Sequence, residues 1–278
     1  MVEIGKRNTL RVVKFVDFGV YLDGEDFREI LLPNRYVPQG CAVGDDIDIF
    51  LYLDSDDLLI ATTETPKAMV GESAYLKVVA VNEVGAFLDW GLAKDLLVPF
   101  GEQQKPMEVG KSYVVFLYID DASQRIAAST QIDKFLPDNS LYFKEQQQVD
   151  LLIYGRTDLG YKAIVNGVVT GLLFNSDVYT PLQSGQVLKG YIKLVRPDKK
   201  LDLYLQIANR EALDNLSEQI LAFLAKEGGR STLTEKSPPE AIYATFGVSK
   251  RVFKQALGAL YKQRLISLDS TGIRLVES

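Results

Sequence analysis

Two kinds of side chain in this sequence could do chemistry on a partner: aromatic rings close to strand glycines, and cations gathered toward the C-terminus. The aromatic candidates, each one or two positions from a glycine, are Phe18, Tyr21, Phe87 and Tyr161. The cationic candidates, all but the first from the C-terminal half, are Arg125, Lys193, Arg196, Lys199, Lys200, Lys250, Arg251, Lys254, Lys262, Arg264 and Arg274. Rings can stack on planar groups and cations can bind phosphates, so these residues are candidates for a surface that binds nucleic acid.

Catalysis has few candidate residues. The 278 residues include no histidine, which excludes Ser-His-Asp and Cys-His units and every zinc site that needs histidine. The single cysteine, Cys41, excludes an intramolecular disulfide and a Cys-only metal site within one chain. The aspartates within 54–57 and 120–121 fall at one hairpin position of two repeats, so we expect solvated turn residues there. We therefore expect no enzyme, no metal site and no cofactor.

No stretch resembles a membrane anchor or an export signal. The longest uninterrupted apolar run in the repeat region, Tyr113 to Ile119, has seven residues, whereas a membrane-spanning helix needs about 20. The first seven residues include Glu3, Lys6 and Arg7 and lack an apolar core. We expect a cytoplasmic protein with no membrane partner.

Charge is distributed unevenly along the chain, whose net charge is −6. Residues 1–141 hold 13 lysines and arginines against 23 acidic residues, whereas 142–208 hold 8 against 6 and 209–278 hold 10 against 8. An acidic half joined to a mildly basic half suggests that a polyanion binds at the basic end.

The first half of the chain is an internal repeat. Phe18-Gly19-Val20-Tyr21 matches Val84-Gly85-Ala86-Phe87, and Ile49–Asp54 matches Val115–Asp120, both at an offset of 66 residues. A third, looser copy follows. Each copy has about five short apolar runs separated by Gly, Asp and Pro, which predicts five strands that close into a small barrel. The expected barrels span residues 1–65, 66–134 and 142–208.

The pattern changes near residue 209 from strands to helices. Apolar residues recur at helical spacing in 213–224, a second helix is expected to end at Gly247, and Ser249 is positioned to cap a third. Two short strands joined by a Gly-ending turn close the chain. Helices followed by a hairpin predict an α+β winged-helix domain over 209–278. The whole chain is therefore mainly β, with three tandem barrels and one winged helix.

The barrel repeats resemble S1 RNA-binding domains, which are OB-type barrels. Phe18 and Tyr21 match the aromatics around the S1 glycine in repeat one, whereas repeat two keeps only Phe87. Arg125 matches the arginine of the last S1 strand, and in repeat three Tyr161 and Lys200 are the nearest equivalents. Prolines replace the S1 histidine in the first two repeats, so none has the complete set.

Three S1-like barrels followed by a winged helix resemble the conserved virulence factor B family. That resemblance implies a cytoplasmic RNA-binding protein that influences the expression of other genes and has no known catalytic centre. Two other functions stay open. A DNA-binding regulator would place helix 249–263 in a major groove, and a scaffold on the ribosome or RNA polymerase would use the acidic barrels.

The distribution of charge predicts where RNA binds. Lys250 and Arg251 fall in the first turn of a helix, where the helix dipole disfavours cations, and a bound phosphate would relieve that cost. Because residues 1–141 repel polyanions, we expect barrel three and the winged helix to carry most of the RNA affinity. The aromatic side chains have an alternative role, which is to pack between neighbouring barrels. Lys199 and Lys200 likewise have an alternative role as solvated charges of a turn. We expect a monomer.

Overall fold

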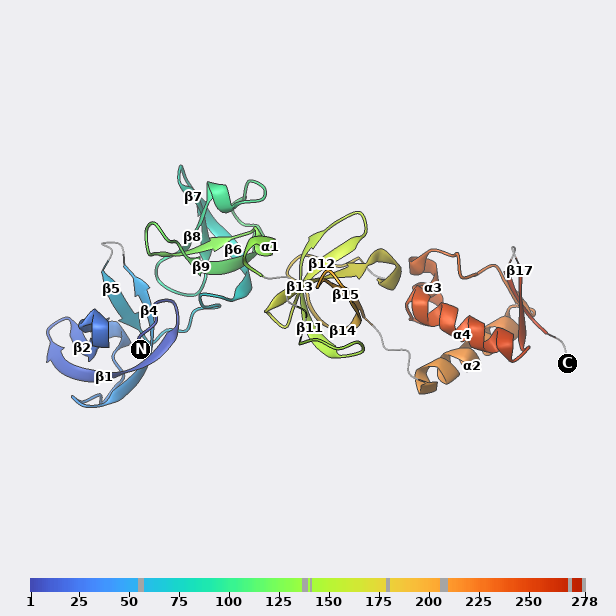
Figure 1. Ribbon diagram of the computed structural model, residues 1–278, viewed down its shortest axis with the longest axis horizontal. Helices are drawn as coiled ribbons and strands as arrows, with labels where there is room; N and C mark the ends of the chain where they lie inside the picture. The colour runs from blue at the N-terminus through green and yellow to red at the C-terminus, as the bar shows by residue number, and fades with distance from the viewer. Residues whose placement is uncertain are drawn as a thin grey trace. The chain divides into compact units, whose positions relative to one another are not determined.

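A computed structural model describes residues 1–54, 58–136, 140, 142–178, 181–205, 210–269 and 272–276 (Figure 1). The chain divides into two compact units, Met1–Phe135 and Leu136–Ser278, here unit 1 and unit 2. Asp56 and Asp57, expected in a turn, lie outside the described residues. No helix in the described part of the chain is long and apolar enough to cross a membrane.

Unit 1 holds two closed barrels of five strands each. Barrel 1 pairs its strands in the order β1-β2-β3-β5-β4 and barrel 2 in the order β10-β8-β7-β6-β9. The strands are β1 (Arg7–Val16), β2 (Gly19–Asp23), β3 (Glu29–Pro33), β4 (Asp46–Leu53), β5 (Leu59–Thr62), β6 (Ser73–Val81), β7 (Gly85–Asp89), β8 (Leu96–Pro99), β9 (Ser112–Ile119) and β10 (Ile126–Ser129). Short helices follow at η1 (Glu25–Phe27), η2 (Asn34–Tyr36), η3 (Phe100–Glu102) and α1 (Ile132–Phe135).

Glycine is required at the start of β2 and of β7. A Cβ atom on Gly19 would lie 2.2 Å from the carbonyl oxygen of Leu32, and one on Gly85 would lie 2.2 Å from that of Val98. Both backbone oxygens belong to the neighbouring strand, so any side chain would push the strands apart. The two barrels therefore have the same close approach of neighbouring strands at equivalent glycines.

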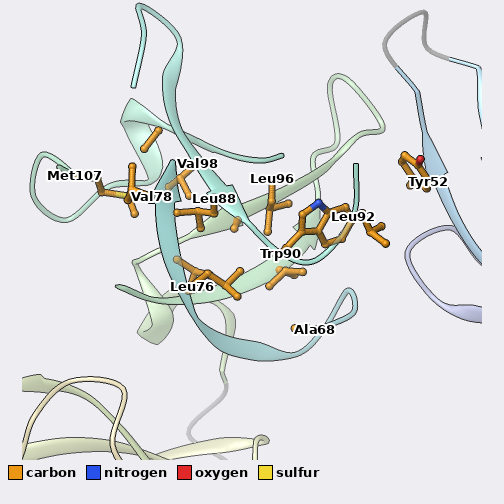
Figure 2. Packing of buried hydrophobic residues seen from close by; sticks show 14 of the residues in the cluster. Tyr52, Ala68, Leu76, Val78, Leu88, Trp90, Leu92, Leu96, Val98 and Met107 are labelled. Atoms are coloured by element: carbon orange, nitrogen blue, oxygen red, sulfur yellow. The ribbon is translucent and has the colours of Figure 1, made fainter. Parts of the chain in front are cut away.

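The two barrels of unit 1 share a hydrophobic cluster. Phe50 and Tyr52 from β4 pack with the core of barrel 2, and the Phe50 and Trp90 rings meet edge to face with centroids 5.7 Å apart. Figure 2 shows Trp90 and Leu92 on the side of this cluster toward Tyr52. The Lys94 ammonium adds hydrogen bonds to two barrel 1 carbonyls, those of Leu53 at 3.1 Å and Asp54 at 2.7 Å.

Unit 2 joins a third closed barrel to a helical domain. The barrel order β11-β12-β13-β15-β14 matches barrel 1 strand for strand, and the last sheet has the order β16-β18-β17. The elements are β11 (Gln148–Arg156), β12 (Gly160–Val165), β13 (Val169–Phe174), η4 (Asn175–Asp177), β14 (Val187–Val195), β15 (Leu201–Tyr204), α2 (Arg210–Lys226), β16 (Arg230–Ser231), α3 (Pro239–Phe246), α4 (Lys250–Lys262), β17 (Ile266–Asp269) and β18 (Gly272–Leu275).

Helix α4 organises the core of the winged helix. Its predicted apolar face is confirmed, since the side chains of Val252, Phe253, Ala256, Leu257 and Leu260 are all buried. Its predicted cap is confirmed as well, because the Ser249 hydroxyl accepts a hydrogen bond from the Val252 amide. The three closed barrels together with this helical domain confirm the mainly β fold class with a C-terminal winged helix. The sequence did not predict the two-residue strand β16.

Candidate nucleic-acid interface

Barrel 1 places the two aromatic residues that the sequence singled out, Phe18 and Tyr21, at its surface. Phe18 is 56% exposed and lies edge-on to the half-buried Tyr21, with ring centroids 6.4 Å apart. The Lys14 ammonium lies 4.8 Å from the Tyr21 ring centroid and pairs with the Glu29 carboxylate at 2.6 Å. Two accessible rings beside a cation can stack a nucleobase and approach its phosphate.

Barrel 2 brings Phe87 and Arg125 together, although they are far apart in the sequence. Both line a hollow of about 340 Å³ whose apolar wall includes Leu97 and Pro99. Phe87 is the second residue after Gly85 on β7, and Tyr21 is the second after Gly19 on β2, so the two rings occupy equivalent positions. A ring and a guanidinium facing one hollow can hold a base and its phosphate together.

Two carboxylates, Asp95 and Asp120, line the barrel 2 hollow with Arg125. Asp120 accepts hydrogen bonds at 2.8 Å from the backbone amide and the hydroxyl of Ser123. These bonds stabilise the ionised form and hold the pKa of the Asp120 carboxyl below its usual range. The hollow therefore combines two cations, Lys94 and Arg125, and two anions, Asp95 and Asp120, with an apolar wall, so it offers hydrogen-bonding groups beside a surface for a base.

Tyr161 does not lie on the outer face of barrel 3, and its predicted base contact is wrong. Its side chain is only 4% exposed and belongs to the barrel core. Tyr161 directly follows Gly160 and pairs with Leu173, as Val20 follows Gly19 and pairs with Leu32. Successive strand residues point to opposite faces, so one position separates Tyr161 from the outward site.

Lys162 occupies the outward position of barrel 3 instead of an aromatic residue. It pairs with Leu172 as Tyr21 pairs with Leu31, and its ammonium lies 5.0 Å from the Tyr154 ring centroid. Lys162 is the second residue after Gly160, so the spacing seen in the first two repeats would have identified it from the sequence. Barrel 3 thus presents a cation where barrels 1 and 2 present rings.

The predicted cations of barrel 3 differ in their surroundings. The Lys193 ammonium lies 2.8 Å from the buried Asp177 carboxylate and 5.3 Å from the Phe174 ring centroid. Arg196 pairs with Asp198 at 3.2 Å. Lys199 and Lys200 are exposed in the turn between β14 and β15, where a phosphate could reach them.

The cations at the start of α4 have partners inside unit 2. The Lys250 ammonium donates to the Ser237 carbonyl at 2.9 Å, and Lys254 pairs with Glu235 at 3.1 Å. The Arg251 guanidinium stacks 4.3 Å from the centroid of the Tyr204 ring of barrel 3. A carbonyl and a carboxylate thus compensate the charges of Lys250 and Lys254, whereas Nη1 of Arg251 is buried with no hydrogen-bond partner among the described residues. Their contacts with RNA stay predictions.

The remaining predicted cations lie at the other end of α4 and in the hairpin. Lys262 and Arg264 are exposed, and Arg274 pairs with Asp269 at 3.3 Å. Arg230 on β16 lies directly opposite Arg274 on β18 and was missed by the sequence analysis. The signal was weak because β16 has only two residues. Within the described ranges, no group of three or more acidic, cysteine or histidine residues could hold a metal ion.

Comparison with protein families agrees with this geometry. An S1 domain matches residues 4–64 and again 70–131, and a CvfB-like winged helix domain matches residues 218–275. The chain is an S1-domain protein with a CvfB-like winged helix. The predicted resemblance to the conserved virulence factor B family is thereby confirmed. Barrel 3 lies outside both S1 matches, in keeping with its displaced aromatic. S1 and winged-helix domains are nucleic-acid-binding types and fit a regulatory RNA-binding protein.

Relatives of this S1 protein extend over most of its length. The uncharacterized protein YitL of Bacillus subtilis is 29% identical, over 93% of this chain and 89% of its own. Conserved virulence factor B of Staphylococcus saprophyticus is 25% identical, over 99% and 95%. A crystal structure of a multidomain protein with nucleic acid binding domains from Streptococcus pneumoniae covers 98% of both chains, with 26% identity and a TM-score of 0.43.

Proposed function

We propose that this protein is a non-catalytic, cytoplasmic regulator that binds single-stranded RNA and influences gene expression after transcription. One observation carries the proposal: the two matched S1 domains each present a ring at the same outward strand position, Tyr21 and Phe87, with a cation nearby. Base stacking on such rings contributes about 1–3 kcal/mol per base and requires unpaired bases. A duplex would hide those base faces, so single strands are the better ligand.

The two units divide the work in this proposal. Unit 1 supplies rings for bases, and unit 2 supplies most of the salt-sensitive phosphate affinity, as its charge predicts. Residues 142–278 carry 18 lysines and arginines against 14 acidic residues, whereas residues 1–141 carry 13 against 23. Exposed ion pairs such as that of Arg274 are weak, so a phosphate can compete for these cations.

Binding of labelled oligonucleotides to the full chain tests this function. Fluorescence anisotropy with a single-stranded RNA 20-mer and a duplex DNA of the same sequence would be measured at two salt concentrations. We expect tighter binding of the RNA, with an affinity that falls as salt rises. Preference for the duplex would favour a DNA-binding regulator that uses α4. Binding of neither would favour a protein scaffold on the ribosome or RNA polymerase that uses the acidic barrels.

A further inference from the structure

The winged helix contains a pair of like charges that its fold forces together. Arg230 on β16 and Arg274 on β18 are direct partners in an antiparallel ladder, so both side chains project from the same face. Ser267 of β17 lies on the other side of Arg274 in the same row. Like charges placed directly opposite destabilise a sheet, and this arrangement therefore costs folding free energy.

The backbone holds the two strands close at this place. A Cβ atom on Gly272 would lie 2.1 Å from the carbonyl oxygen of Ser231, so only glycine permits this spacing. The two arginines cannot separate by moving their strands without opening the sheet. Repulsion between them must be relieved by their side chains or by an anion.

A hollow of about 530 Å³ lies against the pair. Both arginines line it together with the hydroxyl residues Ser231 and Thr232 and with Glu227. The Arg274 side chain is 58% exposed, and its Nε atom lies 3.3 Å from a carboxylate oxygen of Asp269. Among the described residues, Arg230 forms no ion pair.

We infer that Arg230 and Arg274 together bind one phosphodiester group of the RNA backbone in this hollow. Two guanidinium groups side by side match the paired oxygens of a phosphate, and the neighbouring hydroxyls can donate to it as well. Glu227 and Asp269 lower the net charge of the site, which suits the single charge of a diester. The inference rests on the proposed function and assigns one backbone contact to the arginine pair.

The test uses R230Q, R274Q and the double variant in the full chain. Anisotropy with the single-stranded RNA 20-mer is measured over a salt series. We expect each single variant to bind roughly fivefold more weakly. Because both arginines hold one phosphate, the double variant should lose little more than either single one. The slope of log affinity against log salt should become shallower by about 0.7.

Two controls separate binding from folding. Arg11 also pairs across an antiparallel ladder with an aspartate, Asp46, at 3.2 Å, so R11Q removes a comparable exposed ion pair and should leave RNA affinity unchanged. The melting temperature of R230Q should equal or exceed that of the unaltered chain, since the substitution removes repulsion. R230K should restore the salt slope but only part of the affinity.

The outcomes distinguish the two proposals. If the unaltered chain does not bind the 20-mer, the proposed function fails and the arginine pair fails with it. If the unaltered chain binds and the double variant has the same affinity and slope, only the arginine pair is overturned. A lower melting temperature of R230Q, or losses in the single variants that simply add, would equally overturn a shared phosphate site.

Discussion

Barrel 1 and barrel 3 have the same strand order but opposite surface chemistry at the equivalent position. In barrel 1 the second residue after the strand glycine is Tyr21, which faces outward beside Phe18. In barrel 3 that residue is Lys162, and the ring of Tyr161 is buried one position earlier. A shift of one residue along a strand turns a ring from a ligand surface into the core. One barrel topology thus presents an aromatic ring at this position in unit 1 and a cation in unit 2.

The strongest test of this contrast is the substitution Tyr161→Ala. Removing a buried ring from the barrel 3 core should lower the free energy of unfolding by about 3–5 kcal/mol. Chemical denaturation would measure this loss, and Tyr161→Phe should stay close to the unaltered chain. RNA affinity of the folded variant should not change. A variant that keeps its stability but loses RNA binding would return Tyr161 to the interface.

Charge reversal in unit 2 should have the next largest effect. Lys199, Lys200, Lys262 and Arg264 are exposed, and their joint replacement by Glu should weaken RNA binding roughly 100-fold at low salt. The affinity should also become less sensitive to salt. The matched control reverses four exposed cations of unit 1, namely Arg11, Lys77, Lys105 and Lys111. An equal loss in the control would show that unit 2 has no special part in phosphate binding.

Removing the rings of barrel 1 should have a smaller effect of a different kind. The double variant Phe18→Ala with Tyr21→Ala should lose about 1–3 kcal/mol of RNA binding free energy. The salt slope should stay the same, because no phosphate contact is removed. Tyr75 is a suitable control, since it is 47% exposed on β6 and has no predicted RNA contact. If the double variant changed the salt slope of RNA affinity but lost no RNA binding free energy, the proposed division of base and phosphate contacts between the two units would be contradicted.

The two units should also differ in alkaline stability. Burial, with Tyr36 nearby as a second cause, raises the pKa of Tyr52 to about 12, and burial raises that of Tyr118 to about 12 as well. Between pH 10 and 12 the unfolded chain releases these protons while folded unit 1 keeps them, so its stability falls as pH rises. The slope reaches up to about 1.4 kcal/mol per pH unit for Tyr52. Denaturation across this range should show the loss, and Tyr52→Phe should reduce it.

The sequence predicted the elements that depend on local pattern. The 66-residue offset located the first two barrels, and the strand glycines marked the start of β2 and β7. Periodic apolar residues and Ser249 located α4. Phe87 and Arg125, which the sequence singled out by their places in the repeat, line one hollow, and their contact with RNA stays a prediction. In the divergent third repeat the predicted outward position was wrong by one residue, Tyr161 instead of Lys162. The pattern of this repeat was too loose to set the register.

What the sequence by itself determined is the set of barrels, the winged helix and the residue types available for RNA. Tertiary structure alone decided which cations have partners, as for Lys193 with Asp177 and Arg251 with Tyr204. It also decided that Arg230 faces Arg274. The physical reason is that strand and helix patterns act over a few neighbouring residues, whereas charge compensation depends on segments that only folding brings together.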